Sequence, residues 1–283
     1  MTKFHVHLVS DATGETLRSI ARAVIVQFQH ARESDEHLWA LVRSSQQMEE
    51  VLKSISELRG IVLYTLVDPV LRDTLKKGCQ KLGIPSVSVL DPVVAAFTKF
   101  FGEEAHAQPG LQHELDANYF ARIAAMSFTL SHDDGQNVGD LDQADIVLVG
   151  VSRTSKTPTS IYLANQGLKT ANIPIVPGAT LPEQLTKLTA IRLGEQRARS
   201  PQVIGLVINP DRLVMVRRQR LMAMKVTEET DYIDLDGVRN EVAEARKIFQ
   251  RYNWPVIDVT RRSIEETAAA VLNLHARRRE ASR

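Results

Sequence analysis

The eight residues from Gly150 to Thr157 carry the side chains best suited to binding a phosphate group. They read GVSRTSKT and overlap the end of the apolar segment ADIVLVG at 144–150. The order resembles the phosphate-loop pattern G-x-x-x-x-G-K-[ST], except that Ser155 replaces the second glycine. In such a loop, Lys156 would neutralise the terminal phosphates of a nucleotide and the Thr157 hydroxyl would bind Mg²⁺. The predicted nucleotide-binding residues are Gly150, Val151, Ser152, Arg153, Thr154, Ser155, Lys156 and Thr157.

Ser155 is the residue that fits this pattern least well. If its backbone must be left-handed, a residue other than glycine costs roughly 1–2 kcal/mol there. A phosphate held by several backbone N–H groups and by Lys156 would offset that cost. The alternative is a polar turn with an exposed lysine. The buried strand before the turn and Pro158, which suits the first turn of a helix, favour the nucleotide site.

A second loop between a strand and a helix, SDATGET at 10–16, is rich in hydroxyl groups. Asp11 could act there as the base that takes a proton from an incoming hydroxyl group. Phosphate could bind to the start of the helix through Thr13, Gly14 and Thr16. The alternative is a plain helix start, capped by the side chain of Asp11 or Thr13.

A third group of candidates follows the late apolar segment WPVIDVT at 254–260. Ligands of open α/β sheets gather at the carboxyl ends of strands, so Asp258 is a second candidate for the base or for a magnesium ligand. Arg261 and Arg262 are candidate phosphate contacts, and a capped helix start with exposed arginines is the alternative.

The stretch 192–225 is strongly basic, and it contains Arg192, Arg197, Arg199, Arg217 and Arg218. Cations of this kind stabilise a transferring phosphoryl group or bind a phosphorylated partner. We single out Arg217 and Arg218 as candidate phosphate or partner contacts. A solvated helix face is the alternative.

The segment SHDDG at 131–135 holds a histidine and two aspartates. Three adjacent side chains point in different directions and do not surround a metal ion by themselves. We therefore interpret the segment as a polar turn after a helix.

The elements that must position these residues alternate between strands and helices along the chain. Strands are predicted at 4–10, 60–68, 85–91, 144–150, 173–178, 203–209 and 254–260, and helices at 11–28, 69–83, 160–171 and 263–280. This alternation predicts an α/β fold with mostly parallel sheets. A polar stretch broken by Gly and Pro, within 101–140, separates two lobes. We place an N-terminal α/β domain at 1–138 and a P-loop, kinase-like nucleotide-binding and catalytic domain at 139–283.

The overall composition excludes several classes of protein. The chain has 283 residues, of which 43% are hydrophobic and 24% charged, which is typical of a soluble globular protein. A net charge of +1 argues against nucleic acid as a partner. The single cysteine, Cys79, excludes an intrachain disulfide. No uninterrupted apolar run approaches the length of a membrane span, so we expect a cytoplasmic protein.

Five segments of the chain resemble one known family, namely LDQADIVLVGVSRTSKTPTSIYLA, VSDATGET, ARIAAMSFTLSHDDG, IGLVINPDRL and WPVIDVTRRSIEETAA. The family contains the bifunctional kinases and pyrophosphorylases that regulate pyruvate, phosphate dikinase or phosphoenolpyruvate synthase. Its members carry either Ser or Gly before the lysine of the loop, which accommodates Ser155. The resemblance extends over nearly the whole chain.

The resemblance implies an unusual pair of reactions. The family uses ADP to phosphorylate a threonine beside the phosphohistidine of the target enzyme, which inactivates that target. It reverses the modification with inorganic phosphate and releases pyrophosphate. By this resemblance, 150–157 is the ADP-binding segment. The sequence in this region is closer to that of the dikinase regulators than to that of the synthase regulators. A small-molecule kinase and a nucleotide sensor remain alternatives, and a homodimer is one option for the oligomeric state.

Overall fold

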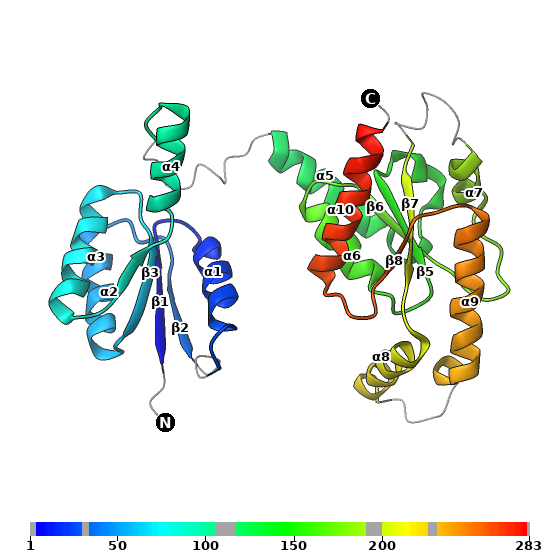
Figure 1. Cartoon of the computed structure of the whole chain (residues 1–283), viewed down its shortest axis with the longest axis horizontal. Helices are drawn as coiled ribbons and strands as arrows, with labels where there is room; N and C mark the ends of the chain where they lie inside the picture. Colours follow the sequence, from blue (N-terminus) through cyan, green and yellow to red (C-terminus); the bar gives the residue numbers. More distant parts are fainter. Residues whose placement is uncertain (1–3, 30–33, 106–116, 191–199, 226–230, 282–283) are drawn as a thin grey trace. The chain divides into compact units, whose positions relative to one another are not determined.

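The computed structural model describes residues 4–29, 34–105, 117–190, 200–225 and 231–281. The chain divides into two compact units, Met1–Glu114 and Leu115–Arg283. Each unit is built around its own parallel sheet (Figure 1). The predicted α/β class with parallel sheets is thereby confirmed.

The first unit has a four-stranded sheet in the order β2-β1-β3-β4, and every pair of neighbouring strands is parallel. Its strands are β1 (His5–Ser10), β2 (Asp35–Trp39), β3 (Gly60–Thr65) and β4 (Ser86–Ser88). Its helices are α1 (Glu15–Ile25), α2 (Ser45–Glu57), α3 (Pro69–Leu82) and α4 (Asp91–Phe101).

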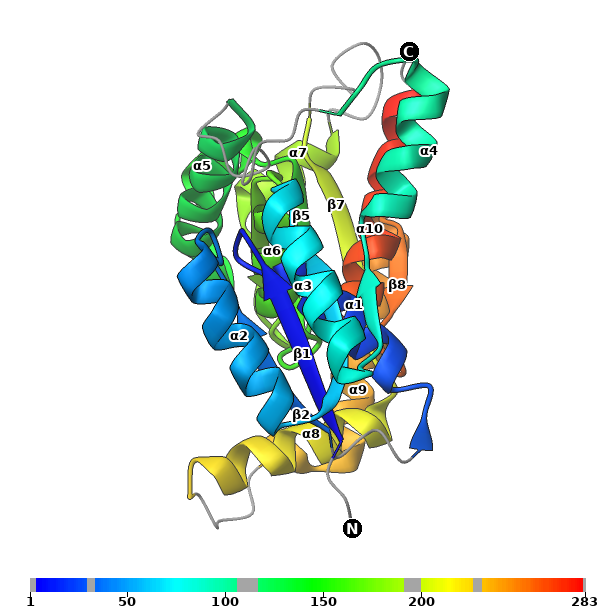
Figure 2. The same ribbon diagram turned by 90° about the vertical axis from the view of Figure 1, so that its left-hand side faces the viewer.

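The two faces of this sheet are covered by different helices. Val6 and Leu8 of β1 pack with Leu17 of α1, whereas Val9 belongs to the cluster formed with α2 and α3. The alternation follows from the two-residue period of a strand. Figures 1 and 2 show α1 on one side of the sheet and α2 and α3 on the other.

The second unit repeats this arrangement with the strand order β6-β5-β7-β8, again parallel throughout. Its strands are β5 (Ile146–Gly150), β6 (Thr170–Pro174), β7 (Gln202–Val207) and β8 (Val256–Asp258). Its helices are α5 (Ala117–Ser131), α6 (Lys156–Asn165), α7 (Glu183–Ala190), α8 (Pro210–Ala223), α9 (Leu235–Arg251) and α10 (Ile264–Glu280). The short 3₁₀ helices η3 (Asp133–Gly135), η4 (Val138–Gln143) and η6 (Asp231–Ile233) complete it.

In both units the first strand is central, because the next strand pairs on one side of it and the third strand on the other. The carboxyl ends of β1 and β5 therefore lie where the strand order reverses, the position at which open α/β sheets bind ligands. The candidate loops at 10–16 and 150–157 both follow these central strands.

Two expectations about the chain's organisation differ from the structure. The unit boundary lies before α5, whereas the sequence placed it after Val138; α5 contacts α6 and β6 and so belongs to the second unit. The predicted caps of α1 were wrong. Gly14 occupies the N-cap with φ 78°, and no side chain caps the helix. Over the ranges that the structure describes, no helix combines the length and apolar character needed to cross a membrane.

Candidate functional site

The segment 150–157 connects the central strand β5 to α6. All five residues of β5 are buried, and the strand ends at Gly150. A Cβ atom at Gly150 would lie 2.7 Å from the carbonyl oxygen of Leu206 and 2.8 Å from Oγ1 of Thr154. Only glycine fits this close approach to β7, so the first glycine of the pattern has a steric cause.

The backbone of this segment is left-handed at two residues that are not glycine. Arg153 has φ 71° and Ser155 has φ 59°. Ser155 stands where the pattern has its second glycine. Its left-handed backbone therefore costs the roughly 1–2 kcal/mol expected for a residue other than glycine. Ser155 is also the N-cap of α6, and no side chain caps this helix. Its first N–H groups, which have no partner within the helix, are therefore open to an anion.

Lys156 is the first residue of α6 and is only 6% exposed. Its Nζ donates a hydrogen bond of 3.0 Å to the carbonyl oxygen of Val151, inside the same loop. Burial lowers the pKa of this ammonium to about 8, although the nearby carboxylates of Asp134 and Asp133 oppose the shift. A buried ammonium with a carbonyl as its bonded partner can exchange that bond for a phosphate oxygen.

Thr157 contacts a carboxylate that the sequence analysis did not select. Its Oγ1 donates to Oδ1 of Asp133 over 2.8 Å, and Nδ2 of Asn172 donates to the same oxygen. Asp133 belongs to the SHDDG turn, 24 residues before Thr157. The sequence showed two carboxylates in a polar turn, and the turn is confirmed, but no spacing indicated that it meets the loop.

The turn is anchored by the residue before it. His132 is 3% exposed, and its ring stacks on Phe128 with centroids 3.7 Å apart. Its Nε2 lies 2.8 Å from Oδ1 of Asp140, and its Nδ1 lies 2.7 Å from the carbonyl oxygen of Phe128. His132 therefore fixes the C-terminal end of α5 and the start of the turn that reaches Thr157.

Arg217, a predicted phosphate or partner contact, is instead buried, at 1% exposure. Its guanidinium forms two hydrogen bonds with Glu241 of α9, at 2.6 and 3.2 Å. It also donates to the carbonyl oxygen of Tyr232 and lies 4.3 Å from the centre of that ring. The guanidinium N–H groups are directed at Glu241 and Tyr232. The prediction that Arg217 contacts phosphate or a partner is therefore corrected. Arg217 joins α8, α9 and η6.

The same network touches the loop. Nη2 of Arg217 lies 3.4 Å from the carbonyl oxygen of Ser152, and Oγ of Ser152 lies 3.2 Å from the Tyr232 hydroxyl. Arg218, the next residue of α8, is exposed. The basic residues Arg192, Arg197 and Arg199 lie outside the described residues. Of the two arginines selected, Arg218 is thus the one able to meet a partner.

The candidates in the first unit form a separate group. Asp11 is 3% exposed, and its Oδ2 accepts a hydrogen bond of 2.5 Å from the backbone N–H of Val67. Thr13 and Thr16 are exposed on either side of Gly14, at the uncapped start of α1. The carboxylate of Asp11 thus joins the ends of β1 and β3, while the two threonines remain open to solvent.

Asp258 ends the edge strand β8 and is exposed. Burial tends to raise the pKa of its carboxyl, but the hydrogen bonds from the hydroxyl and N–H of Thr260 outweigh it and lower the pKa. Oγ1 of Thr260 also accepts from the N–H of Asn209 at the start of α8. Asp258 is therefore a weakened base that holds the end of β8, and Arg261 and Arg262 are exposed beside it.

Comparison with known proteins identifies the family of this chain. A sequence profile described as kinase/pyrophosphorylase matches residues 6–272. The chain belongs to the kinase/pyrophosphorylase family. Three relatives of this chain are named as pyruvate, phosphate dikinase regulatory proteins. One from Chelativorans sp. is 52% identical and covers 97% of both chains. One from Paramagnetospirillum magneticum is 51% identical over 99% of this chain and 86% of its own. One from Caulobacter vibrioides is 50% identical over 96% and 83%.

Likeness to solved structures is weak. A carbohydrate transporter from Acidothermus cellulolyticus in complex with myo-inositol has 12% identity and a TM-score of 0.25, covering 98% of this chain and 99% of its own. A TM-score this low supports no conclusion about the fold or function of this chain.

The residues of this candidate site could hold a magnesium ion only together with a nucleotide. Among the described residues there is no group of three or more His, Cys, Asp or Glu side chains that could hold a metal ion. The Thr157 hydroxyl and the Asp133 carboxylate supply two hard oxygen atoms. Mg²⁺ commonly takes one or two protein oxygens and completes its shell with phosphates and water, so the donor set is compatible.

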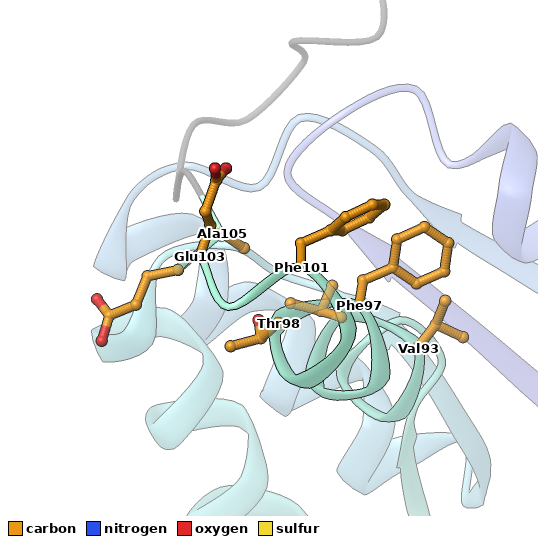
Figure 3. A pocket seen from close by; sticks show the side chains of 8 residues that line it. Val93, Phe97, Thr98, Phe101, Glu103 and Ala105 are labelled. Atoms are coloured by element: carbon orange, nitrogen blue, oxygen red, sulfur yellow. The ribbon is translucent and has the colours of Figure 1, made fainter.

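An apolar hollow of about 370 Å³ lies against α4 in the first unit. Figure 3 shows Val93, Phe97 and Phe101 projecting from the same side of this helix, with Glu103 at the rim. The residues that line it include two glutamates and no cation. The hollow therefore does not suit the phosphate groups that a kinase/pyrophosphorylase must bind.

Proposed function

We propose that the chain is an ADP-dependent protein kinase that phosphorylates a threonine of pyruvate, phosphate dikinase and thereby inactivates it. We propose further that it is the phosphate-dependent pyrophosphorylase that removes the same phosphate. Membership of the kinase/pyrophosphorylase family and the names of the relatives support both reactions and this target. ADP as donor, and the threonine beside the phosphohistidine, rest on the resemblance of the sequence blocks.

The observation that carries the proposal is the buried Lys156 at the uncapped start of α6, directly after the tight exit at Gly150. ADP would lie along 150–157 with its β-phosphoryl group between the N–H groups of the helix start and the Lys156 ammonium. These groups neutralise the charge that develops as the β-phosphorus separates from AMP. Bound Mg²⁺, held in part by Thr157 and Asp133, would add further neutralising charge.

In the forward direction the threonine oxygen bonds to the β-phosphorus, the bond from that phosphorus to AMP breaks, and the hydroxyl proton passes to a base. In reverse, an oxygen of inorganic phosphate bonds to the phosphorus of phosphothreonine, and the bond from that phosphorus to the threonine oxygen breaks. The threonine oxygen takes a proton, and pyrophosphate is released. Positioning and charge neutralisation provide most of the rate enhancement in both directions, so one cradle can serve both. Lys156→Ala would then abolish both reactions. Loss of only the kinase reaction would contradict a shared cradle.

The remaining predicted contacts are assigned to the protein substrate or to inorganic phosphate. Thr13, Gly14 and Thr16 lie at the uncapped start of α1, and Arg218, Arg261 and Arg262 are exposed. Exposed cations and free helix N–H groups suit a phosphate-bearing partner. A cytoplasmic location and a homodimer stay predictions.

The decisive experiment incubates the full chain with pyruvate, phosphate dikinase and ADP labelled in its β-phosphate. The proposal expects label on a threonine of the dikinase and one AMP for each phosphothreonine formed. Parallel reactions contain phosphoenolpyruvate synthase as target, ATP as donor, or no protein target. Labelling of the synthase alone would transfer the function to that enzyme. Turnover of ATP without a target would indicate a small-molecule kinase, and ADP binding without any transfer would indicate a sensor.

A further inference from the structure

We propose that Asp134 is the base that accepts the proton of the substrate threonine in the kinase direction. The inference rests on the proposed function, since it assigns a step of that reaction. It replaces Asp11 and Asp258, the two bases that the sequence suggested, with a residue of the turn that contacts the loop.

The backbone of the turn is held by one side chain of β6. The N–H of Asn172 donates to the carbonyl oxygen of His132 over 3.2 Å. Its side-chain oxygen accepts from the N–H of Asp134 over 3.1 Å, and its Nδ2 donates to Asp133. With Thr157 bound to Asp133 as well, the turn is attached both to β6 and to α6. The position of Asp134 relative to the loop is therefore set by hydrogen bonds.

The two carboxylates of the turn are used differently. Oδ1 of Asp133 accepts hydrogen bonds from both Thr157 and Asn172. Asp134 is exposed, and among the described residues its carboxylate has no hydrogen-bonded or ion-paired partner. A general base needs a free oxygen that a substrate hydroxyl can reach. Asp133 is half-buried and its Oδ1 is engaged twice, whereas Asp134 is exposed and neither of its carboxylate oxygens is engaged among the described residues.

The charge of Asp134 acts on the phosphate-binding lysine. Among the groups that raise the pKa of Lys156 against the effect of burial, Asp134 has the largest influence and Asp133 the next. The chain geometry agrees, because Asp134 directly follows Asp133, which accepts a hydrogen bond from Thr157, the neighbour of Lys156.

The backbone of Asp134 is strained, with φ 53° and ψ 38°. A left-handed residue other than glycine is uncommon and persists where the surroundings impose it. Here the bond to Asn172 imposes it. The left-handed backbone of Asp134 is therefore part of the anchored turn, together with Gly135, which follows with φ 80°. The aspartate gives this position an exposed carboxylate that a glycine would lack.

The alternatives have carboxylates that are already engaged. That of Asp11 is buried and bonded to Val67, and that of Asp258 is bonded to Thr260 with a lowered pKa. In the step proposed here, the threonine O–H bond breaks and its proton goes to Oδ of Asp134. The oxygen forms the new bond to the β-phosphorus of ADP, and AMP takes the electron pair of the bond that breaks.

The test compares Asp134→Asn with wild type in the full chain, at saturating ADP and with the dikinase as target. Asn tolerates the left-handed backbone, so the fold is retained, and a thermal melt checks this. We expect transfer in a single turnover to slow by about 100-fold or more, within the range for loss of a general base. The dissociation constant of ADP, measured by calorimetry, is expected to stay within about threefold of wild type. Asp142→Asn, at an exposed aspartate of η4, is the matched control and should change neither quantity.

A second variant separates a base from a residue that merely positions the loop. Glycine suits φ 53°, and Asp134→Gly leaves room for a small carboxylate. Added formate should restore its rate by about tenfold or more, and should not restore Asp133→Gly. The assignment is overturned if Asp134→Asn transfers at near the wild-type rate, if it loses ADP affinity in step with rate, or if formate has no effect. A wild-type chain that makes no phosphothreonine would instead overturn the proposed function, and this inference with it.

Discussion

At the scale of single residues, the protonation of Lys156 couples the loop to pH. Burial lowers the pKa of this ammonium to about 8, so the side chain is a cation below that pH and a neutral amine above it. Only the cation attracts phosphate. We therefore expect ADP to bind with nearly constant affinity between about pH 7 and 7.5, and to bind up to about tenfold more weakly for each further pH unit above 8.

Calorimetric titration of ADP between about pH 7 and 9.5 measures this dependence. Lys156→Arg is the control, because a guanidinium remains charged throughout the range. At pH 7 the arginine variant should bind ADP more weakly than wild type, because a guanidinium differs in shape from an ammonium. Its affinity for ADP should nevertheless stay constant across the range. The same slope in the arginine variant would show that another group titrates, and the lowered pKa of Lys156 would not be the cause.

Some residues of the candidate site could be selected from the sequence, and others could not. Gly150, Lys156 and Thr157 could be selected because strand, turn and helix are local, and local spacing places their side chains. Asp133 and Asp134 could not be assigned to the site, because their contact with α6 depends on how α5 packs beside β6. Arg217 was selected for its charge, which says nothing of the half-buried Glu241 that faces it.

At the scale of elements, the ion pair between Arg217 and Glu241 holds α8 to α9. Arg217 is 1% exposed, and its partner side chain is 19% exposed. Removing one member of a buried pair leaves the other charge without compensation, which typically destabilises a protein by about 3–5 kcal/mol. We expect Arg217→Met to lower the free energy of unfolding by an amount of that order, measured by urea denaturation.

Arg218→Met on the same helix is the matched control, since this exposed arginine should contribute less than about 0.5 kcal/mol. If Arg217→Met left stability unchanged and weakened binding to the dikinase, Arg217 would be the partner contact that the sequence suggested. If Arg218→Met alone weakened that binding, the exposed side of α8 would carry the contact.

Helices and strands could be predicted from the sequence where their buried residues form a clear apolar pattern. The central strands β1 and β5 were found from apolar runs. The helix predicted at 263–280 is α10, which begins with a capping box formed by Ser263 and Glu266. The edge strand β2 was missed, because its sequence DEHLW is half-buried and largely polar. The apolar helix α4 was also missed, although Val93, Phe97 and Phe101 project from one side of it (Figure 3); none of its residues is buried.

At the scale of the whole molecule, the chain contains the same strand order twice. No repeat is visible in the sequence, because strand order is fixed by which strands pair and many sequences can satisfy it. The boundary between the units could not be located from composition either. The polar stretch that suggested it extends beyond the start of α5, whose packing against α6 assigns it to the second unit.

The second unit has a core of its own, which leads to a prediction about the isolated fragment. All the buried residues of its large apolar cluster, from Phe128 to Val271, come from this unit, and so do Lys156, Thr157 and the turn at 133–134. We expect residues 115–283 to unfold in one cooperative transition and to bind ADP within about threefold of the affinity of the full chain. Calorimetry of the fragment measures both quantities, and Lys156→Ala in the fragment should remove the binding but not the transition. A fragment that folds without binding ADP would contradict this prediction.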